Sequence, residues 1–193
     1  MTRVVNLYGG PGTGKSTTAA ALFAEMKYRG VNCEYIQEYA KDKAWEFGTN
    51  HLGVPKVFQA QEYIFGKQHF RMRRCATDVD LIITDSPLFL GLVYMPDDFP
   101  LPSLRSTIRE AYNLYDNLDV FLVRTKPYNT KGHFQTEQEA KTLDKVIKAM
   151  LDEQGVSYSL IDSGRAAVDQ IIEKMTLKGW PMHRLPWDKP PED

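Results

Sequence analysis

The sequence predicts an α/β fold in three layers, with a five-stranded parallel sheet covered by helices on both faces. Two observations predict it. Short apolar stretches, which are typical of buried parallel strands, alternate along the chain with longer stretches of helical period. The first apolar stretch also runs through a glycine-rich loop directly into a helix. The five strands are expected at residues 4–8, 31–37, 81–84, 119–123 and 158–161.

Helices are expected between these strands. The first begins at Lys15 and ends near Gly30, because glycine favours helix C-termini. The most clearly amphipathic one spans 135–154 and carries two favourable i,i+4 pairs, Glu137 with Lys141 and Asp144 with Lys148. The other helical stretches are 56–77, 104–118 and 166–175, with a short helix and loop in 42–55 and a helical turn or loop at 88–94.

The composition limits the classes of function. A net charge of −1 gives the whole molecule no electrostatic attraction to nucleic acid, although a local basic patch stays open. Cys33 and Cys75 lack the spacing of metal ligands, and no apolar run approaches the roughly 18 residues of a membrane span. The chain enters its first strand at once, without room for a signal peptide. We expect a cytoplasmic protein with no membrane partner, one domain over 1–177 and a proline-rich tail over 178–193.

The loop Gly9–Ser16 reads GGPGTGKS and fits the phosphate-binding pattern G-x-x-x-x-G-K-[ST]. Between a strand and a helix, its backbone N–H groups form an anion site at the helix N-terminus. Lys15 is expected on the β- and γ-phosphates of ATP, and the Ser16 hydroxyl group on Mg²⁺. The residues expected at the phosphates are Gly10, Gly12, Thr13, Gly14, Lys15, Ser16 and Thr17.

Three further strands end in charged residues, and ligands of parallel α/β sheets bind beyond such ends. Asp85 follows the third strand and is expected to hold Mg²⁺ together with Ser16. Glu38 follows the second strand and is the candidate general base, because a kinase must accept a proton from the attacking hydroxyl group. Arg124 follows the fourth strand. The alternative for each is a solvated charge at a strand end.

The segment 124–135 is polar and basic, which suggests a lid. A kinase must exclude water from its site, and a loop with cations both closes the site and neutralises charge on the transferring group. Arg124 and Lys131 are the catalytic candidates there, with Lys126 beside them. A solvated basic loop is the alternative.

The P-loop, Glu38-Tyr39-Ala40-Lys41 and Asp85-Ser86-Pro87 together resemble the small P-loop kinases that act on nucleosides and nucleotides. The segment after the second strand is similar to the Glu-Tyr-Ala-Arg of nicotinamide-riboside-kinase-like proteins, with Lys41 where arginine is usual. Deoxynucleoside kinases also place a glutamate there, which implies the base role for Glu38. By analogy with P-loop kinases, the strand order is expected to be 2-3-1-4-5. The resemblance covers roughly the first 90 residues, and compact kinases of this kind also occur in bacteriophages, which would place the protein in the host cytoplasm.

The phosphoryl acceptor is expected beside the helical stretch 56–77. Deoxynucleoside kinases read the base there with a glutamine, so the resemblance makes Gln61 and Gln68 candidates, although side chains on such a helix usually belong to the core. The basic segment 67–74 could instead contact phosphates of a DNA or RNA strand, and Arg71 and Arg74 are its substrate candidates.

Three functions stay open on the sequence alone. The first is an ATP- and Mg²⁺-dependent kinase whose acceptor is a hydroxyl or phosphate group of a nucleoside or nucleotide. The second is a kinase that acts on a hydroxyl group within a DNA or RNA strand. The third, from another class, is an NTP-hydrolysing switch or ATPase. A homodimer is compatible with all three.

Overall fold

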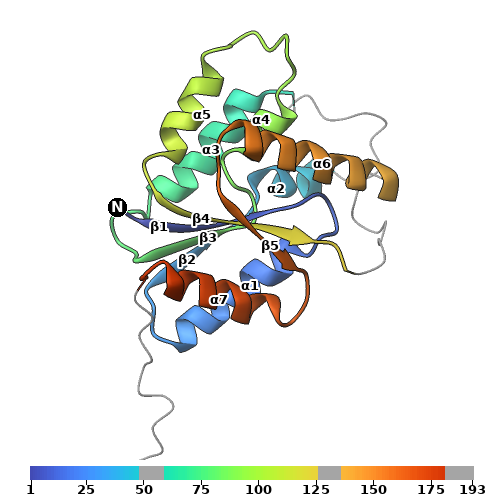
Figure 1. Cartoon of the computed structure of the whole chain (residues 1–193). Coiled ribbons are helices and arrows are strands. Elements are labelled where there is room, and N and C mark those ends of the chain that lie inside the picture. The colour runs from blue at the N-terminus through green and yellow to red at the C-terminus, as the bar shows by residue number, and fades with distance from the viewer. Residues whose placement is uncertain (48–58, 126–135, 181–193) are drawn as a thin grey trace, which may run out of the picture.

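The computed structural model describes residues 1–47, 59–125 and 136–180, and it contains a single five-stranded parallel sheet within them (Figure 1). The strands are β1 (Arg3–Tyr8), β2 (Cys33–Ile36), β3 (Leu81–Thr84), β4 (Asp116–Val123) and β5 (Tyr158–Asp162). Their order is β2-β3-β1-β4-β5, which confirms the predicted order 2-3-1-4-5. Parallel neighbours need crossover connections, and the helices supply them.

Two helical layers cover the sheet and bury its apolar side chains (Figure 1). On one face lie α1 (Lys15–Tyr28) and α7 (Ala167–Leu177), which pack on alternate residues of the central strands such as Val5 and Leu7. The other face carries α2 (Tyr39–Phe47), α3 (Gln61–Arg73), α4 (Leu90–Tyr94), α5 (Leu104–Tyr112) and α6 (Glu137–Glu153). No helix in this described part of the chain is long and apolar enough to span a membrane.

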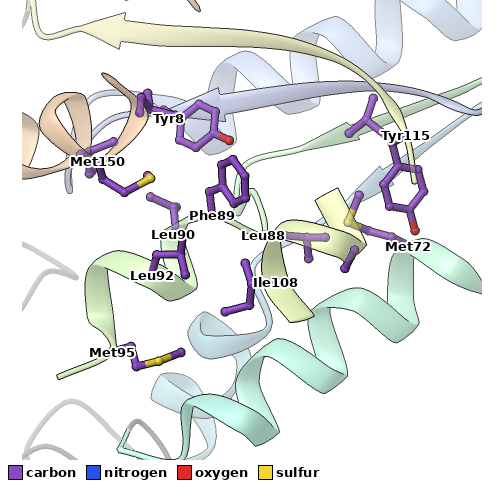
Figure 2. Close-up of a cluster of buried hydrophobic side chains, with 14 of the residues drawn as sticks. Tyr8, Met72, Leu88, Phe89, Leu90, Leu92, Met95, Ile108, Tyr115 and Met150 are labelled. Carbon is purple, nitrogen blue, oxygen red and sulfur yellow. The ribbon is translucent and has the colours of Figure 1, made fainter. Parts of the chain in front are cut away.

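The core on the second face is the larger one, and Figure 2 shows its centre. Tyr8 projects from β1 toward Phe89, and Ile108 and Met72 approach from α5 and α3. All four side chains are at most 3% exposed. Burial of this kind contributes about 25 cal/mol per Å² of apolar surface. This packing fixes the helices of the second layer against that face of the sheet.

The boundary between α5 and β4 differs from the prediction. The helix ends at Tyr112 and not at residue 118, and β4 begins at Asp116 and not at residue 119. Asn117 terminates the helix by donating from Nδ2 to the carbonyl groups of Tyr112 and Tyr115, at 2.9 and 3.0 Å. Asp116 pairs with Arg3 across the sheet. The start of this strand is therefore set by pairing with β1, which an apolar pattern does not reveal.

The first helix, α1, has its predicted bounds, and α2 begins at Tyr39, three residues before the predicted stretch 42–55. The remaining helices are shorter than their predicted ranges or shifted by one or two residues. The clearest case is α3, which begins at Gln61, whereas the predicted stretch 56–77 starts in part of the chain that is not described. Of the two predicted pairs on α6, Glu137–Lys141 is formed at 2.8 Å. The other pair is replaced, because Lys148 lies over the Phe121 ring at 4.6 Å and Asp144 has other partners.

A polar cluster interrupts the core beside the first half of β4. Asp119 is 4% exposed and accepts hydrogen bonds from Asn6 Nδ2 at 3.1 Å and from the Tyr112 hydroxyl group at 2.7 Å. Asn6 Nδ2 also donates to Asn117 Oδ1 at 2.9 Å. All these donors are neutral. Burial therefore dominates and raises the pKa of Asp119 from an ordinary value of 3.8 to about 6.

Asp119→Asn is expected to remove a pH dependence of stability. Between about pH 4 and pH 6 the folded protein holds a proton on Asp119 that the unfolded chain has lost, so stability falls as the pH rises through this window. At pH 7 the variant should be more stable by about 1–3 kcal/mol. Urea unfolding at several pH values measures both effects. The exposed Asp98→Asn is the control, and equal pH profiles for wild type and Asp119→Asn would contradict the prediction.

Candidate functional site

The glycine-rich loop lies at the carboxyl edge of the sheet, between β1 and α1. Gly14 forms the N-cap of α1 with φ +88°, a left-handed conformation that residues with a Cβ atom rarely adopt. Thr13 is buried, and its hydroxyl group donates to the Gly10 carbonyl group at 2.9 Å, which closes the loop on itself. The backbone N–H groups at the start of α1 have no helical partner and are available to an anion.

Lys15 folds back over this loop. Its Nζ donates to the carbonyl oxygens of Gly9 and Gly10 at 2.6 and 3.1 Å. Burial lowers the pKa of Lys15, while the nearby carboxylates of Glu38 and Asp85 act in the opposite direction. The ammonium group is thus held between the loop and two acidic side chains, where it would meet the phosphates of a bound nucleotide.

Asp85, which follows β3, is the centre of a hydrogen-bond network. It is 2% exposed, and it accepts from the Tyr35 hydroxyl group at 2.9 Å and from the Glu38 backbone N–H at 3.1 Å. The Tyr35 hydroxyl group also hydrogen-bonds Ser16. Ser16 and Asp85 therefore lie beside the same hydroxyl group. Hydroxyl and carboxylate oxygens are the ligands that Mg²⁺ prefers, so this pair fits that ion.

The remaining ligands of such an ion would not come from a protein cage. Among the residues that the structure describes, no group of three or more His, Cys, Asp and Glu side chains is placed to hold a metal. Mg²⁺ in nucleotide sites is typically bound by one or two protein ligands together with phosphates and waters. The donor set found here agrees with that pattern.

Glu38 stands between β2 and α2, next to Lys15 and Asp85. Burial raises the pKa of its carboxyl group, and Lys15 partly offsets the rise. Tyr94, at the end of α4, is close enough for the Glu38 charge to add to the effect of burial, which raises the pKa of Tyr94 to about 12. A carboxylate of raised basicity at the edge of a phosphate site is suited to accept a proton.

Arg124 lies against the loop, held by contacts that the sequence does not reveal. Its Nη1 donates to the Pro11 carbonyl group at 2.7 Å, and its Nη2 pairs with Asp144 of α6 at 3.2 Å. The other Asp144 oxygen accepts from the Gly10 backbone N–H at 2.6 Å. A Cβ atom on Gly10 would lie 2.7 Å from Asp144 Oδ1 and 2.8 Å from the Ala140 carbonyl oxygen. Glycine at position 10 therefore allows α6 to pack directly on the loop.

The two glutamines predicted on the acceptor side, Gln61 and Gln68, are both buried in α3. Gln68 is 4% exposed, and its amide accepts from the Tyr39 N–H at 3.0 Å and donates to Thr84 Oγ1 at 3.4 Å. Gln61 is also buried, at the first turn of α3. Gln68 thus joins the start of α2 to β3, and a contact of Gln61 or Gln68 with a base stays a prediction.

The basic segment 67–74 does not form one surface toward the loop. Arg71 pairs with Asp42 at 2.5 Å and lies over the Tyr39 ring at 4.9 Å. Arg74 follows the last turn of α3, close to Ala76, whose carbonyl group accepts from Thr2 just before β1. That end of α3 lies at the amino edge of the sheet, opposite the loop. Arg74 therefore lies away from the loop, and a contact between Arg74 and the phosphates of a DNA or RNA strand stays a prediction.

Three residues of the site were missed by sequence reasoning: Tyr35, Tyr94 and Asp144. Tyr35 is an ordinary residue of a predicted strand, and the sequence predicts that Asp144 pairs with Lys148 on its own helix. Their partners are distant in sequence, so no local pattern marks them. Lys131, Lys126 and most of the lid-like segment 124–135 lie outside the described residues.

Asp144→Ala is expected to loosen the loop. The change leaves the Gly10 N–H and the Arg124 guanidinium group without this carboxylate, which should lower the free energy of unfolding by about 1–3 kcal/mol. Nucleotide affinity should fall as well, because the loop is no longer fixed to α6. Denaturant unfolding and calorimetric titration measure the two effects. Glu153→Ala, an exposed change on the same helix, should alter stability by about 0.5 kcal/mol or less, and equal losses in both variants would contradict this role of Asp144.

The chain has a P-loop NTPase fold: a parallel sheet of strand order 2-3-1-4-5, with a loop of the phosphate-binding pattern after its first strand. A family model described as an AAA domain matches residues 4–167. The chain therefore belongs to this family of AAA domains. No curated protein sequence matches it.

Solved structures with a similar fold include NadR protein in complex with NR, at a TM-score of 0.69 and 16% identity over 95% of this chain and 53% of NadR. NadR in complex with NAD and AMP-PNP has a TM-score of 0.66 and 16% identity, over 95% of this chain and 51% of NadR. YorR from Bacillus subtilis, in complex with phosphorylated GDP, has a TM-score of 0.54 and 19% identity, over 93% of this chain and 99% of YorR. This chain thus spans about half the length of NadR, and at these identities the likeness concerns the fold alone.

Proposed function

We propose that the protein is an ATP- and Mg²⁺-dependent kinase that transfers the γ-phosphate to a hydroxyl or phosphate group of a nucleoside or nucleotide. One observation carries the proposal. Lys15, Asp85 and Glu38 converge at the mouth of the loop, and Asp85 binds the backbone of Glu38 directly. A simple phosphate site needs the lysine and a magnesium-binding carboxylate, whereas a second carboxylate of raised basicity suits a reaction in which an acceptor loses a proton.

Each part of the site then has a task. The loop N–H groups and Lys15 bind the phosphates. Lys15 also stabilises the negative charge that develops on the oxygen between the β- and γ-phosphates as the bond to the γ-phosphate breaks. Ser16 and Asp85 would hold Mg²⁺, which neutralises phosphate charge when bound. Glu38 accepts the proton of the attacking hydroxyl group; for a phosphate acceptor, already ionised, it would only orient the nucleophile. Arg124, Lys131 and the segment 124–135 are proposed to close over the transferring group.

A small-molecule acceptor is favoured over a nucleic-acid strand. Arg71 is engaged by Asp42, and the C-terminal end of α3 with Arg74 lies at the opposite edge of the sheet. This placement argues against a strand that follows the basic segment into the site. Two proteins of similar fold are in complex with NR, in NadR, and with phosphorylated GDP, a free nucleotide, in YorR. Both observations support a free nucleoside or nucleotide as acceptor.

The test is transfer of radiolabelled γ-phosphate from ATP to three panels: nucleosides, nucleoside monophosphates and oligonucleotides. A labelled product from either small-molecule panel, dependent on Mg²⁺, is expected. A product only from oligonucleotides, with an acceptor KM that rises steeply with salt, would establish strand phosphorylation instead. Release of inorganic phosphate at the same rate with and without every acceptor would identify an ATPase or switch.

A further inference from the structure

A polar cavity lies on the molecule away from the loop. It has a volume of about 420 Å³ and is formed where α5 and α6 end beside the start of β4. Asp116, the first residue of β4, pairs with Arg3, the first residue of β1. The loop follows the other end of β1, roughly 17 Å further along the strand. The cavity is therefore at the amino edge of the sheet, separate from the site described above, and its volume lies within the usual range for small-molecule sites.

Asp119 forms the deep end of this cavity. It is 4% exposed and lines the cavity, its carboxylate accepts from Asn6 and Tyr112, and the Tyr8 hydroxyl group lies beside it; all three groups are neutral. Within the described part of the chain it forms no ion pair. A carboxylate oxygen accepts up to two hydrogen bonds, so each Asp119 oxygen retains an acceptor position. Burying such a group without a charged partner is unfavourable unless further donors reach it, which points to a ligand with N–H groups.

The aromatic wall and the basic rim of the cavity indicate that the ligand also has a flat ring and an anionic group. Phe89 and Tyr112 stack on each other at 4.1 Å between ring centroids and both line the cavity, which suits a flat ring. The exposed Arg109, whose Nε donates to Gln154 at 2.5 Å, and Lys178, paired with Asp116, lie at the rim. The cavity thus has a carboxylate at its buried end, and, among the residues that the structure describes, the rim holds one guanidinium group without an acidic partner at Arg109 and one ion-paired lysine at Lys178.

We propose that this cavity is a second nucleotide site, which takes a nucleoside monophosphate with a guanine-type base. Adjacent N–H donors on the base would reach the two Asp119 oxygens, the ring would lie beside Phe89 and Tyr112, and the phosphate would meet Arg109 and Lys178. Among common bases, guanine presents such a pair of donors next to each other, at its ring N–H and its 2-amino group. The proposal concerns a site apart from the loop and does not depend on the phosphotransfer reaction.

The test is calorimetric titration of GMP into the protein with its loop saturated by AMP-PNP and Mg²⁺. Binding should weaken by about tenfold or more in Asp119→Asn and in Arg109→Glu, since each loses a charged hydrogen-bond partner. IMP, which lacks the 2-amino group, should bind the wild type about tenfold more weakly than GMP does. In Asp119→Asn, IMP and GMP should have the same affinity. Arg109 is exposed, so its variant reports on binding even if Asp119→Asn alters the fold.

The controls separate this site from the proposed active site. Arg74→Ala removes an exposed arginine at the same edge of the sheet outside the cavity, and it should bind GMP like the wild type. Lys15→Ala, titrated without AMP-PNP, should keep the GMP binding that Asp119→Asn loses. GMP binding that disappears in Lys15→Ala and persists in both cavity variants would overturn the proposal, as would equal affinities for GMP and IMP. Neither result depends on whether phosphotransfer is detected.

Discussion

Replacing Lys15 with alanine is expected to lower γ-phosphate transfer by about 10³-fold or more, or roughly 4 kcal/mol in the barrier. Lys15 is the one cation that the structure places both on the loop carbonyl groups and beside Glu38 and Asp85 within the described residues. When phosphate replaces these contacts, the ammonium group stabilises charge that grows as the γ-phosphate departs. Single-turnover transfer with saturating ATP measures the loss.

The fold should survive this change. Lys15 packs on no apolar core, and its hydrogen bonds are to two loop carbonyl groups that water can replace. The matched control is Lys27→Ala, which removes an exposed lysine from the same helix and should leave transfer unchanged. Lys15→Ala turnover within about tenfold of wild type, in a protein with an unchanged circular dichroism spectrum, would show that this lysine is not part of the transfer machinery.

The parts of the site that local sequence reveals are those carried by a strand end. The loop, Glu38 and Asp85 each follow a short apolar strand, and parallel strands bring their carboxyl ends to one edge. The structure places all three within one hydrogen-bonded and charged neighbourhood. Strand order was not visible in the pattern and came from analogy with P-loop kinases, because pairing depends on contacts between distant residues.

Contacts between elements are what the sequence conceals. Asp144 lies on an amphipathic helix where Lys148, four residues on, is an obvious partner, yet its oxygens face Gly10 and Arg124 instead. The basic run in α3 misleads for a related reason. A helix rises about 1.5 Å per residue, so the 13 residues of α3 extend roughly 20 Å and carry the last arginines to the far edge of the sheet.

The polar start of β4 illustrates the same limit at a strand. Asp116-Asn117-Leu118-Asp119 lacks the apolar character of a buried strand and resembles the end of a helix. Pairing with β1 makes it a strand, and Asn6 and Tyr112 each donate one hydrogen bond to Asp119 from two other elements. The cavity beside Asp119 forms where β1, the end of α5 and the start of β4 meet, so no local sequence motif predicts it.

Glu38→Gln and Asp85→Asn are expected to separate proton transfer from metal binding. Glu38→Gln removes the proton acceptor, so transfer to a hydroxyl acceptor should fall by about 10²–10⁴-fold while Mg²⁺-ATP still binds. In the wild type, burial raises the pKa of Glu38. The base acts only when ionised, so the rate should climb with pH through a midpoint above the usual value for a glutamate, and this acid limb should vanish in Glu38→Gln.

Asp85→Asn should instead raise the Mg²⁺ concentration needed for half-maximal rate. Asparagine keeps one oxygen for the Glu38 N–H or the Tyr35 hydroxyl group but loses the negative charge that favours the ion. Tyr35→Phe is the matched variant: it removes the hydroxyl group that joins Ser16 to Asp85 without changing any charge, and it should shift the Mg²⁺ requirement less. Weakened ATP binding in Glu38→Gln, together with an unaltered Mg²⁺ response in Asp85→Asn, would show that the two carboxylates have the opposite roles.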